Sequence, residues 1–371
     1  MTQPLGFPAV WLRHNCPCPD CRDPVTGQRL VEITQISNVR VATVTAESAD
    51  SLEVTFTPGG HRSVFSRAWL AAYDDAHASG GIRDPSDRGG PRTEDGKTLW
   101  RAADLPAVPT AGWASYLADD QVRVSLLDAV ARYGVGLLRG VPASAGMVTA
   151  VVETFGYVRE TNYGRLFDVR VVADPANLAF TSRAIAPHTD NPYRDPVPTL
   201  QLLHCLRDAD LGGDTVLIDG FAAAALRAAD PVSFDVLTAT PIPFSYVDKA
   251  TSLTACQPLI ALSARGRIAC VRLNNRSMQP PRLPFDQAAA VYAAYAAWAE
   301  LVARPEFALR LRLAPGDCLV FDNTRILHAR TAFSAPPAST PTVAERHLQG
   351  CYADLDGLLS TLAVLRRDRN R

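Results

Sequence analysis

The chain has 371 residues, of which 47% are apolar and 20% are charged, and its formal net charge is −1. Such a chain is typical of a globular protein with a large core, and it gives no indication of a nucleic-acid or anionic-membrane partner. No apolar run approaches the ~20 residues that span a bilayer, and the N-terminus lacks the parts of a secretion signal, so we expect a cytoplasmic protein.

The first quarter of the chain is expected to form a small β-rich module. Short β-branched runs recur in it, at residues 29–33, 38–44 and 51–56. Residues 65–73 have the pattern of a short helix capped by Ser66. The stretch from residue 78 to residue 97 is rich in Gly, Asp and Pro, which is typical of a linker. We therefore predict one domain over residues 1–97 and a second over residues 98–371.

The second domain alternates short strand-like runs with helical segments. Strands are expected at residues 134–140, 170–172, 199–203, 214–218, 268–273, 309–313, 317–321 and 347–352. Helices are expected at residues 115–117, 121–133, 145–155, 221–229 and 285–303. Many short strands with helical inserts favour a mainly β, α+β fold, in which a barrel or sandwich of jelly-roll type carries helices outside.

Three of the eight cysteines, Cys16, Cys18 and Cys21, lie within six residues near the N-terminus. Thiolates at this spacing favour tetrahedral zinc, which needs a fourth ligand. His14 and His61 are both candidates, and we favour His61 because it follows a Gly-Gly turn between two expected strands. A reduced thiol cluster without metal is the alternative. The other five cysteines lie singly in apolar surroundings, which is typical of core packing.

A second metal signal is His188-Thr189-Asp190. Side chains two residues apart point the same way along an extended backbone, so His188 and Asp190 can supply two ligands of a 2-His-1-carboxylate iron site. The triplet alone is weak evidence, and it needs a second histidine from elsewhere. His328 ends a strand-like run near the C-terminus, and Arg346 follows at the start of another run, where its guanidinium could bind a dicarboxylate.

With these motifs, the sequence resembles the 2-oxoglutarate-dependent non-haem iron dioxygenases, and more narrowly their γ-butyrobetaine and trimethyllysine hydroxylase branch. The resemblance covers nearly the whole chain. It includes Trp11 to Cys18, His188 to Asp190, Gln201 to Cys205, Gly212 to Thr215, Asn274 to Arg276, Pro315 to Asn323 and Arg346 to Asp354. It departs from the family at His14, where relatives often have Asp, and in a longer segment between His328 and Arg346.

The resemblance implies a zinc-binding N-terminal domain and a double-stranded β-helix catalytic domain. It implies zinc on Cys16, Cys18, Cys21 and His61, iron on His188, Asp190 and His328, and 2-oxoglutarate on Arg346. It also implies an aromatic cage for a quaternary ammonium group and two amides for a carboxylate. The cage positions are Tyr163, Phe167, Phe180 and Tyr352, and the amides are Asn177 and Asn274.

The reaction implied by the family is hydroxylation of a small quaternary ammonium substrate with O2, most simply γ-butyrobetaine to L-carnitine. A trimethylaminoalkyl phosphonate remains an alternative substrate if Arg183 or Arg276 points inward, and trimethyllysine fits less well. A catalytically degenerate zinc-containing binding protein is the alternative of another class. Relatives further imply a homodimer. We expect His204 to be a core histidine or one that supports the ligands, and not itself a ligand.

Overall fold

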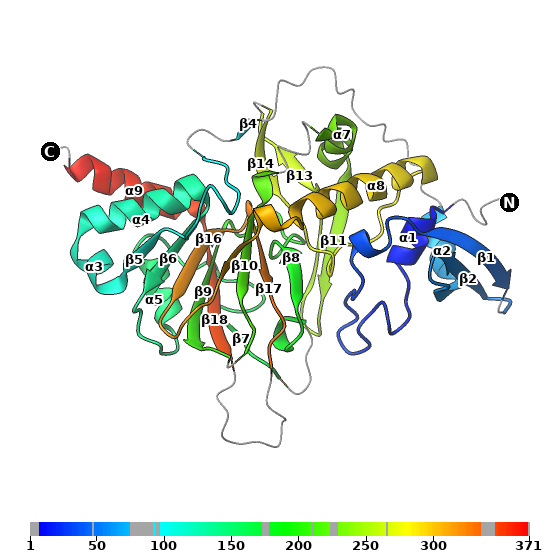
Figure 1. Ribbon diagram of the computed structural model, residues 1–371, viewed down its shortest axis with the longest axis horizontal. Coiled ribbons are helices and arrows are strands. Elements are labelled where there is room, and N and C mark those ends of the chain that lie inside the picture. Colours follow the sequence, from blue (N-terminus) through cyan, green and yellow to red (C-terminus); the bar gives the residue numbers. More distant parts are fainter. Residues whose placement is uncertain are drawn as a thin grey trace.

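The computed structural model describes residues 7–46, 48–74, 92–93, 97–172, 178–209, 211–222, 229–264, 266–334 and 346–369. The chain extends along one long axis, with its N-terminal elements near one end and its last helix near the other (Figure 1). A large strand-rich body lies between them.

The N-terminal part is a small sheet packed beside short helices. Its three antiparallel strands are β1 (Arg40–Ala46), β2 (Ser51–Thr57) and β3 (Arg62–Ser66). The helical pieces are α1 (Ala9–His14), the 3-10 turn η1 (Ile33–Gln35) and α2 (Arg67–Asp74). The strands expected at 38–44 and 51–56 and the helix expected at 65–73 are confirmed, and Ser66 Oγ accepts the N–H of Trp69 at 3.3 Å as its cap.

The strand expected at residues 29–33 is wrong. Arg29 pairs with Arg22 as a single bridge, and the chain then turns into the 3-10 piece at Ile33. The Arg29 guanidinium is buried and donates to main-chain oxygens of His14, Asn275 and Met278. The β-branched residues of this run pack against the second domain in an irregular segment and do not extend a sheet.

Two antiparallel-rich sheets form the body of the second domain. The six-stranded sheet has the order β5-β6-β16-β9-β18-β7, and the four-stranded sheet has the order β15-β10-β17-β8. Strands of the first are β5 (Thr110–Gly112), β6 (Val135–Arg139), β7 (Phe167–Val169), β9 (Leu200–Arg207), β16 (Cys318–Asp322) and β18 (His347–Ala353). Strands of the second are β8 (Ile185–His188), β10 (Thr215–Asp219), β15 (Leu309–Leu311) and β17 (Ile326–Arg330).

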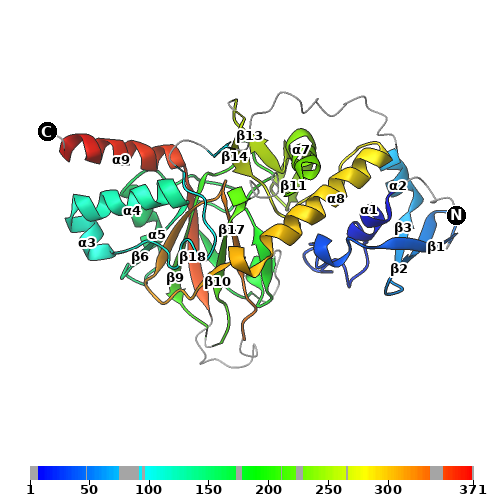
Figure 2. The same ribbon diagram turned by 45° about the horizontal axis from the view of Figure 1, so that its top comes forward.

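Helices cover this body on two sides. On one side lie α3 (Trp113–Ala118), α4 (Asp120–Tyr133), α5 (Met147–Glu153) and α9 (Leu355–Arg369), which share a hydrophobic cluster with β9 and β16. On the other side lie α7 (Pro231–Ala239) and α8 (Phe285–Val302). Figure 2 shows α8 running from the strands toward α1 and the N-terminal sheet. One buried cluster joins Trp11 and Phe56 to Trp298, so the N-terminal part shares a core with the second domain.

Two smaller sheets lie beside α7. One pairs β11 (Pro241–Val247) with β12 (Ser252–Pro258), and the other joins β13 (Ile260–Leu262), β14 (Arg267–Val271) and β4 (Arg92–Thr93). Short 3-10 turns lie at Leu178–Phe180, Gly220–Ala222 and Pro305–Phe307.

Most elements expected in the second domain are confirmed, with two exceptions. The strand expected at residues 170–172 is wrong, because the pairing with β18 involves Phe167–Val169, three residues earlier. Of the helix expected at 221–229, residues 223–228 lie outside the described part of the chain. The patterns of α1, α7, α9 and β11 to β13 were not recognised in the sequence.

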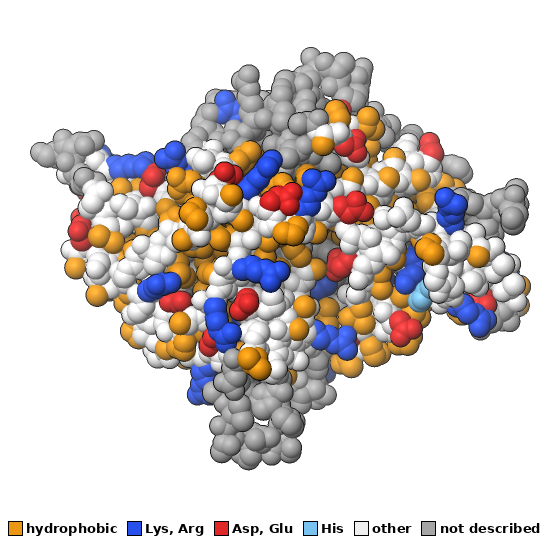
Figure 3. Space-filling view, viewed as in Figure 1, with side chains coloured by type: hydrophobic (Ala, Val, Ile, Leu, Met, Phe, Trp, Pro, Cys, Tyr) orange, Lys and Arg blue, Asp and Glu red, His pale blue; other side chains and the backbone are white. Residues whose placement is uncertain are grey.

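The face seen in Figure 3 carries Lys and Arg side chains interspersed with Asp and Glu, without a large area of one sign. Among the described residues, no helix combines the length and the apolar character needed to cross a membrane.

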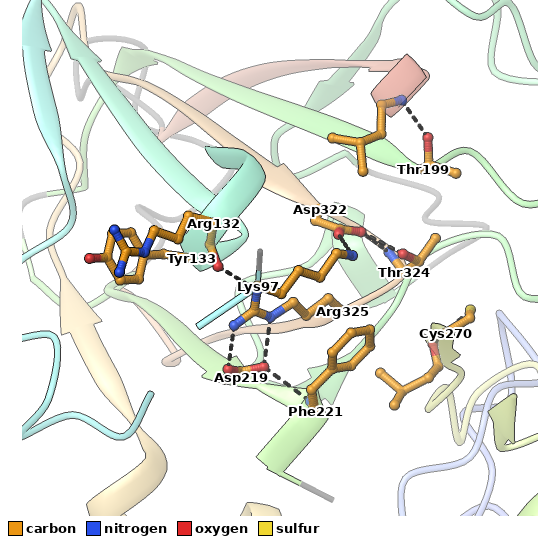
Figure 4. Close-up of polar contacts among 12 residues, drawn as sticks. Lys97, Arg132, Tyr133, Thr199, Asp219, Phe221, Cys270, Asp322, Thr324 and Arg325 are labelled. Carbon is orange, nitrogen blue, oxygen red and sulfur yellow. Dashed lines mark hydrogen bonds and ion pairs between the residues drawn. The ribbon is translucent and has the colours of Figure 1, made fainter. Parts of the chain in front are cut away.

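A buried ion-pair network joins the start of the second domain to the turn before β17. Arg325 and Asp219 are both fully buried, with Nη2 to Oδ2 at 2.7 Å and Nε to Oδ1 at 3.0 Å. Arg325 also donates to the carbonyls of Thr98 and Arg132. Next to it, Lys97 Nζ lies 3.1 Å from Asp322 Oδ2 (Figure 4). The last residue of the expected linker, Lys97, and the residue after it, Thr98, are therefore bound to the core.

We predict that Arg325→Met lowers the free energy of unfolding by about 3–5 kcal/mol, because Asp219 would keep a buried charge without its partner. Urea unfolding followed by circular dichroism measures this. Arg366→Met is the matched control, since Arg366 pairs with Asp128 at the exposed surface of α9 and such pairs contribute about 0–1 kcal/mol. Equal unfolding midpoints for the two variants would contradict the prediction.

Candidate metal centres and active site

His188, Asp190 and His328 come together because β8 and β17 are antiparallel neighbours. His188 is the last residue of β8 and lies opposite His328 in the register of the two strands. The two rings have centroids 4.1 Å apart. His188 Nε2 lies 3.4 Å from Asp190 Oδ1, and His328 Nε2 lies 4.0 Å from Asp190 Oδ2. Two imidazoles and one carboxylate therefore converge at one point from two elements.

Hydrogen bonds fix the orientation of these ligands. His188 Nδ1 donates to the carbonyl of Ala186 at 2.9 Å, so its Nε2 is the nitrogen left with a lone pair. Asp190 Oδ2 accepts from Gln201 Nε2 at 2.8 Å and from Tyr352 Oη at 2.9 Å. The other carboxylate oxygen, Oδ1, is the one that lies near His188.

The protonation states suit a divalent cation. Burial opposes the charged form of Asp190, but the two histidines hold the pKa of its carboxyl well below its usual range. Burial lowers the pKa of His188, and burial together with the neighbouring His188 lowers the pKa of His328 to about 3. At neutral pH the carboxylate is ionised and both imidazoles are neutral. This donor set is that of the 2-His-1-carboxylate iron(II) sites.

The triad lies in a cavity of about 370 Å³. Among the described residues, its lining includes every other expected site residue of the active site: Arg346, Tyr163, Phe167, Phe180, Tyr352 and Asn274. Asn177 lies outside the described residues. Arg276 also lines this cavity, whereas Arg183 lines a separate cavity behind β8. His204 is fully buried on β9 and lines neither.

Arg346 immediately precedes β18 and is buried. Its Nη2 donates to the carbonyl of Gly213 at 3.3 Å, and its guanidinium stacks over the ring of Phe333 at 5.5 Å. A Cβ on Gly213 would lie 3.0 Å from Arg346 Nε, and the φ of Gly213 is +78°, so glycine makes room for the arginine. The result is a fixed cation in the same cavity as the triad.

Aromatic rings form a connected group in the cavity, and two of its members were not expected from the sequence. Tyr163 contacts Phe167 and Tyr246, Phe167 contacts Tyr352, and Tyr193 stacks on Tyr246 with centroids 5.2 Å apart. The hydroxyls of Tyr163 and Tyr193 are 2.9 Å apart. Tyr193 follows the iron motif by three residues, which is a usable signal. Tyr246 comes from β11, and no local pattern points to it.

The cysteine cluster forms a second centre in the N-terminal part. The three thiols lie around His61 Nε2, at 3.3 Å for Cys16, 3.7 Å for Cys18 and 3.4 Å for Cys21. A tetrahedral zinc ion with ordinary Zn–S and Zn–N bonds requires a sulfur-to-nitrogen separation of about 3.5 Å. The four donors therefore fit zinc. The structure brings His61 to the cluster and not His14, whose Nε2 is 2.7 Å from Asn275 Oδ1.

Neighbouring groups stabilise the thiolate form of Cys16, whereas the hydrogen bond to Cys16 and burial raise the pKa of Cys21. Ser63 Oγ donates to Cys16 Sγ and Arg13 Nη1 donates to Cys21 Sγ, both at 2.8 Å. The hydrogen bond from Cys21, aided by His61 and Ser63, lowers the pKa of Cys16 to about 4. Such donors to the ligand sulfurs are what a thiolate zinc site requires.

We predict that the purified protein holds about one zinc ion per chain in this cluster and that His61→Ala loses most of it, because a structural site needs all four ligands. Atomic absorption measures the zinc content. His347→Gln is the control, since His347 lies outside the cluster and binds Asp168 at 2.7 Å. Full zinc content in His61→Ala would contradict this assignment.

Comparison with known proteins matches two family descriptions to this chain. Residues 100–352 match the family described as taurine catabolism dioxygenase TauD, TfdA family. Residues 3–71 match the N-terminal domain described as gamma-butyrobetaine hydroxylase-like. The γ-butyrobetaine dioxygenase of a Pseudomonas species is 34% identical over 97% of this chain and 91% of its own length.

Two further relatives are more distant. The human γ-butyrobetaine dioxygenase is 29% identical over 97% of this chain and 91% of its own length. The trimethyllysine dioxygenase of Meyerozyma guilliermondii is 27% identical over 97% of this chain and 90% of its own length. With a complete iron triad and matches over nearly its whole length, the chain belongs to the TauD/TfdA family of iron- and 2-oxoglutarate-dependent dioxygenases.

Proposed function

We propose that the enzyme hydroxylates γ-butyrobetaine to L-carnitine, with 2-oxoglutarate and O2 consumed and succinate and CO2 released. The observation that carries this proposal is the group of aromatic rings that lines the same cavity as the iron triad. A trimethylammonium group has no proton to donate, so shape and aromatic faces must recognise it, at about 0.5–2 kcal/mol per contact. The relatives named for γ-butyrobetaine add support.

In this proposal, His188, Asp190 and His328 hold iron(II), and Arg346 binds the distal carboxylate of 2-oxoglutarate through its two-pronged guanidinium. Iron(II) and 2-oxoglutarate together supply the oxidising chemistry. The chain's own work is to orient Asp190, to hold the substrate with one methylene toward the metal, and to keep water out.

Tyr163, Phe167, Phe180 and Tyr352 are proposed to enclose the trimethylammonium group, with Tyr193 and Tyr246 behind them. The ring of Phe167 packs directly against Gly350 of β18. The contact is so close that a Cβ at position 350 would lie 2.5 Å from Cζ and 2.6 Å from Cε2 of the ring. The hydroxyl of Tyr352 is engaged by Asp190, so only its ring is left to the substrate. Tyr352 thereby joins the substrate cage to the iron ligand.

Asn274 and Asn177 are proposed for the substrate's anionic end. The Asn274 amide also supports the iron strand, since its Nδ2 donates to the carbonyl of Thr189 at 2.9 Å. A trimethylaminoalkyl phosphonate is the second candidate substrate, and Arg276 in the cavity lining favours it. Arg183 does not, because its side chain is 58% exposed and lies 3.8 Å from Asp23.

The proposal also covers the type of β-fold and the division of the chain into two domains. We infer that the six- and four-stranded sheets form a double-stranded β-helix, and that residues 1–97 are a zinc-binding domain attached to a catalytic domain of residues 98–371. The closed set of three thiolates and one imidazole supports a structural role for the zinc. A homodimer is proposed from the likeness to relatives, and a cytoplasmic location from the sequence alone.

Tyr352→Phe is predicted to weaken iron(II) binding by about 10–100-fold, because it removes one of two donors that orient Asp190. Anaerobic titration of the apoprotein with iron(II) measures the affinity independently of turnover. The cage ring is retained, so the KM for substrate changes less. An unchanged iron affinity would mean that Gln201 alone is sufficient to orient the carboxylate.

The proposed reaction is tested with a panel of trimethylammonium compounds in a 2-oxoglutarate turnover assay. We expect substrate-dependent succinate formation with γ-butyrobetaine, lost in His188→Ala, which lacks an iron ligand. Turnover with a trimethylaminoalkyl phosphonate or trimethyllysine but not with γ-butyrobetaine would contradict the substrate and leave the reaction class standing. Mass spectrometry of the product identifies the hydroxylated carbon.

A further inference from the structure

Asn191, the residue after the iron ligand Asp190, has an amide that nothing in the protein satisfies. Its side chain lines the active-site cavity, and the residue is only 2% exposed. Neither its Nδ2 nor its Oδ1 has a hydrogen-bond partner. Among the described residues that line this cavity, no other has both a donor and an acceptor atom buried without a partner. Because buried polar groups are nearly always hydrogen-bonded, this amide points to a ligand in the cavity.

The backbone explains why two consecutive side chains face the same cavity. Along an extended strand, Asp190 and Asn191 would point to opposite sides. Asn191 instead has a φ of +56°, in the left-handed region that asparagine tolerates better than most residues, and it is the only non-glycine residue of the described chain there. Asn323 binds the N–H and the carbonyl of Asp190, and the carbonyl of Asn191 accepts the N–H of Arg194 at 3.0 Å. The unusual conformation is therefore held from both sides.

Asn191 and the proposed 2-oxoglutarate arginine lie at opposite ends of the iron site. The start of β8 pairs with Arg330, and its end pairs with His328. Arg330 and Arg346 both stack over the ring of Phe333, so Arg346 belongs to the part of the cavity near the start of β8. Asn191 lies three residues beyond the other end of β8. In the proposed function, 2-oxoglutarate occupies the first part, which leaves the part near Asn191 to the substrate.

The amide predicted from the sequence for the substrate's anion is already largely engaged. Asn274 Nδ2 donates to the carbonyl of Thr189 at 2.9 Å, and its Oδ1 accepts the N–H of Ser277 at 3.3 Å. These bonds leave Asn274 one N–H for a ligand. Asn191 still has its whole amide to offer, at the same end of the iron strand.

The chemistry of the two substrate ends decides which of them Asn191 binds. A trimethylammonium group has no proton to donate and no oxygen to accept one, so it cannot satisfy an amide. A carboxylate or phosphonate oxygen accepts an N–H in a charge-assisted hydrogen bond, which is stronger than a neutral one. Rotation of the amide can turn Nδ2 toward such an oxygen. The buried, unpartnered amide therefore suits the anionic end.

We propose that Asn191 is a specificity-determining residue, and that its Nδ2 donates a hydrogen bond to the anionic end of the substrate. This inference rests on the proposed function, because it requires a substrate that carries both a quaternary ammonium and an anion. One short segment then binds both iron, through Asp190, and the end of the substrate that is opposite to the aromatic cage.

The test uses γ-butyrobetaine as substrate and butyltrimethylammonium, which has the cation but no carboxylate, as a competitive inhibitor. Asn191→Gly removes the amide, and glycine adopts a positive φ without strain. We expect this variant to raise the KM for γ-butyrobetaine roughly 10–100-fold, as for a lost hydrogen bond to a charged group. The inhibition constant of butyltrimethylammonium and the KM for 2-oxoglutarate stay unchanged.

Asn191→Asp is a second variant, because aspartate has the same size and also tolerates the left-handed conformation. It replaces the donor by a negative charge, so we expect the KM for γ-butyrobetaine to rise at least as much as in Asn191→Gly. The inhibition constant of butyltrimethylammonium does not rise, since a cation is not repelled.

Asn38→Gly is the matched control, because Asn38 is exposed in the N-terminal part and does not line this cavity. Melting temperature and iron(II) affinity are measured for each glycine variant, and we expect wild-type values. An unchanged KM for γ-butyrobetaine in Asn191→Gly would overturn the inference. An equal loss of affinity for both ammonium compounds would do the same, and so would a matching loss of iron(II) affinity, since Asn191 would then act through Asp190.

A different result would identify failure of the proposed function itself. If the wild type bound butyltrimethylammonium but turned over no trimethylammonium carboxylate or phosphonate, the proposed substrate class would be wrong, and the role of Asn191 would fall with it. Turnover of γ-butyrobetaine by the wild type with no effect of Asn191→Gly would overturn only the role of Asn191.

Discussion

The active site depends on one strand register, which pairs His328 of β17 with His188 of β8. Side chains alternate along a strand, so a slip of one residue would turn His328 away from the cavity. Asp190 lies beyond the end of β8, where no strand pairing holds it. Asn323 replaces that pairing, because its Oδ1 accepts the N–H of Asp190 at 2.8 Å and its Nδ2 donates to the Asp190 carbonyl at 2.9 Å. Two strands and one amide thus bring three ligands together.

Charged residues hold the turn that carries Asn323 in place. Asp322 pairs with Lys97 and caps Thr324, while Arg325 is bound to Asp219 and to the carbonyl of Thr98. Buried ion pairs contribute little net stability compared with apolar packing, but they are strict about geometry. The network therefore contributes more to the conformation of the turn between β16 and β17 than to net stability. That conformation in turn helps to set the register of β17.

The sequence was most informative where chemistry requires particular residue types at short spacing. The cysteine cluster, the His188 to Asp190 triplet and the strands near His328 could be recognised because each is local. The fourth zinc ligand required a choice between two histidines, which a hairpin pattern resolved. Tyr246 and Asn191 could not be found, because their places in the cavity depend on how β11 packs and on the left-handed backbone that follows Asp190. The strand predicted at residues 29–33 was wrong for a similar reason, since β-branched residues suit any partly buried extended segment.

The side chains that line the cavity also determine which kind of cation it can bind. Its one described carboxylate, Asp190, lies between the two histidines, and its Oδ2 also accepts hydrogen bonds from Gln201 and Tyr352. A primary ammonium would lose its water and find no acidic partner there, at the cost that attends any unpaired buried charge. A trimethylammonium group is weakly hydrated and needs only aromatic faces. In the proposed function, the aromatic rings therefore favour a quaternary cation over a primary ammonium.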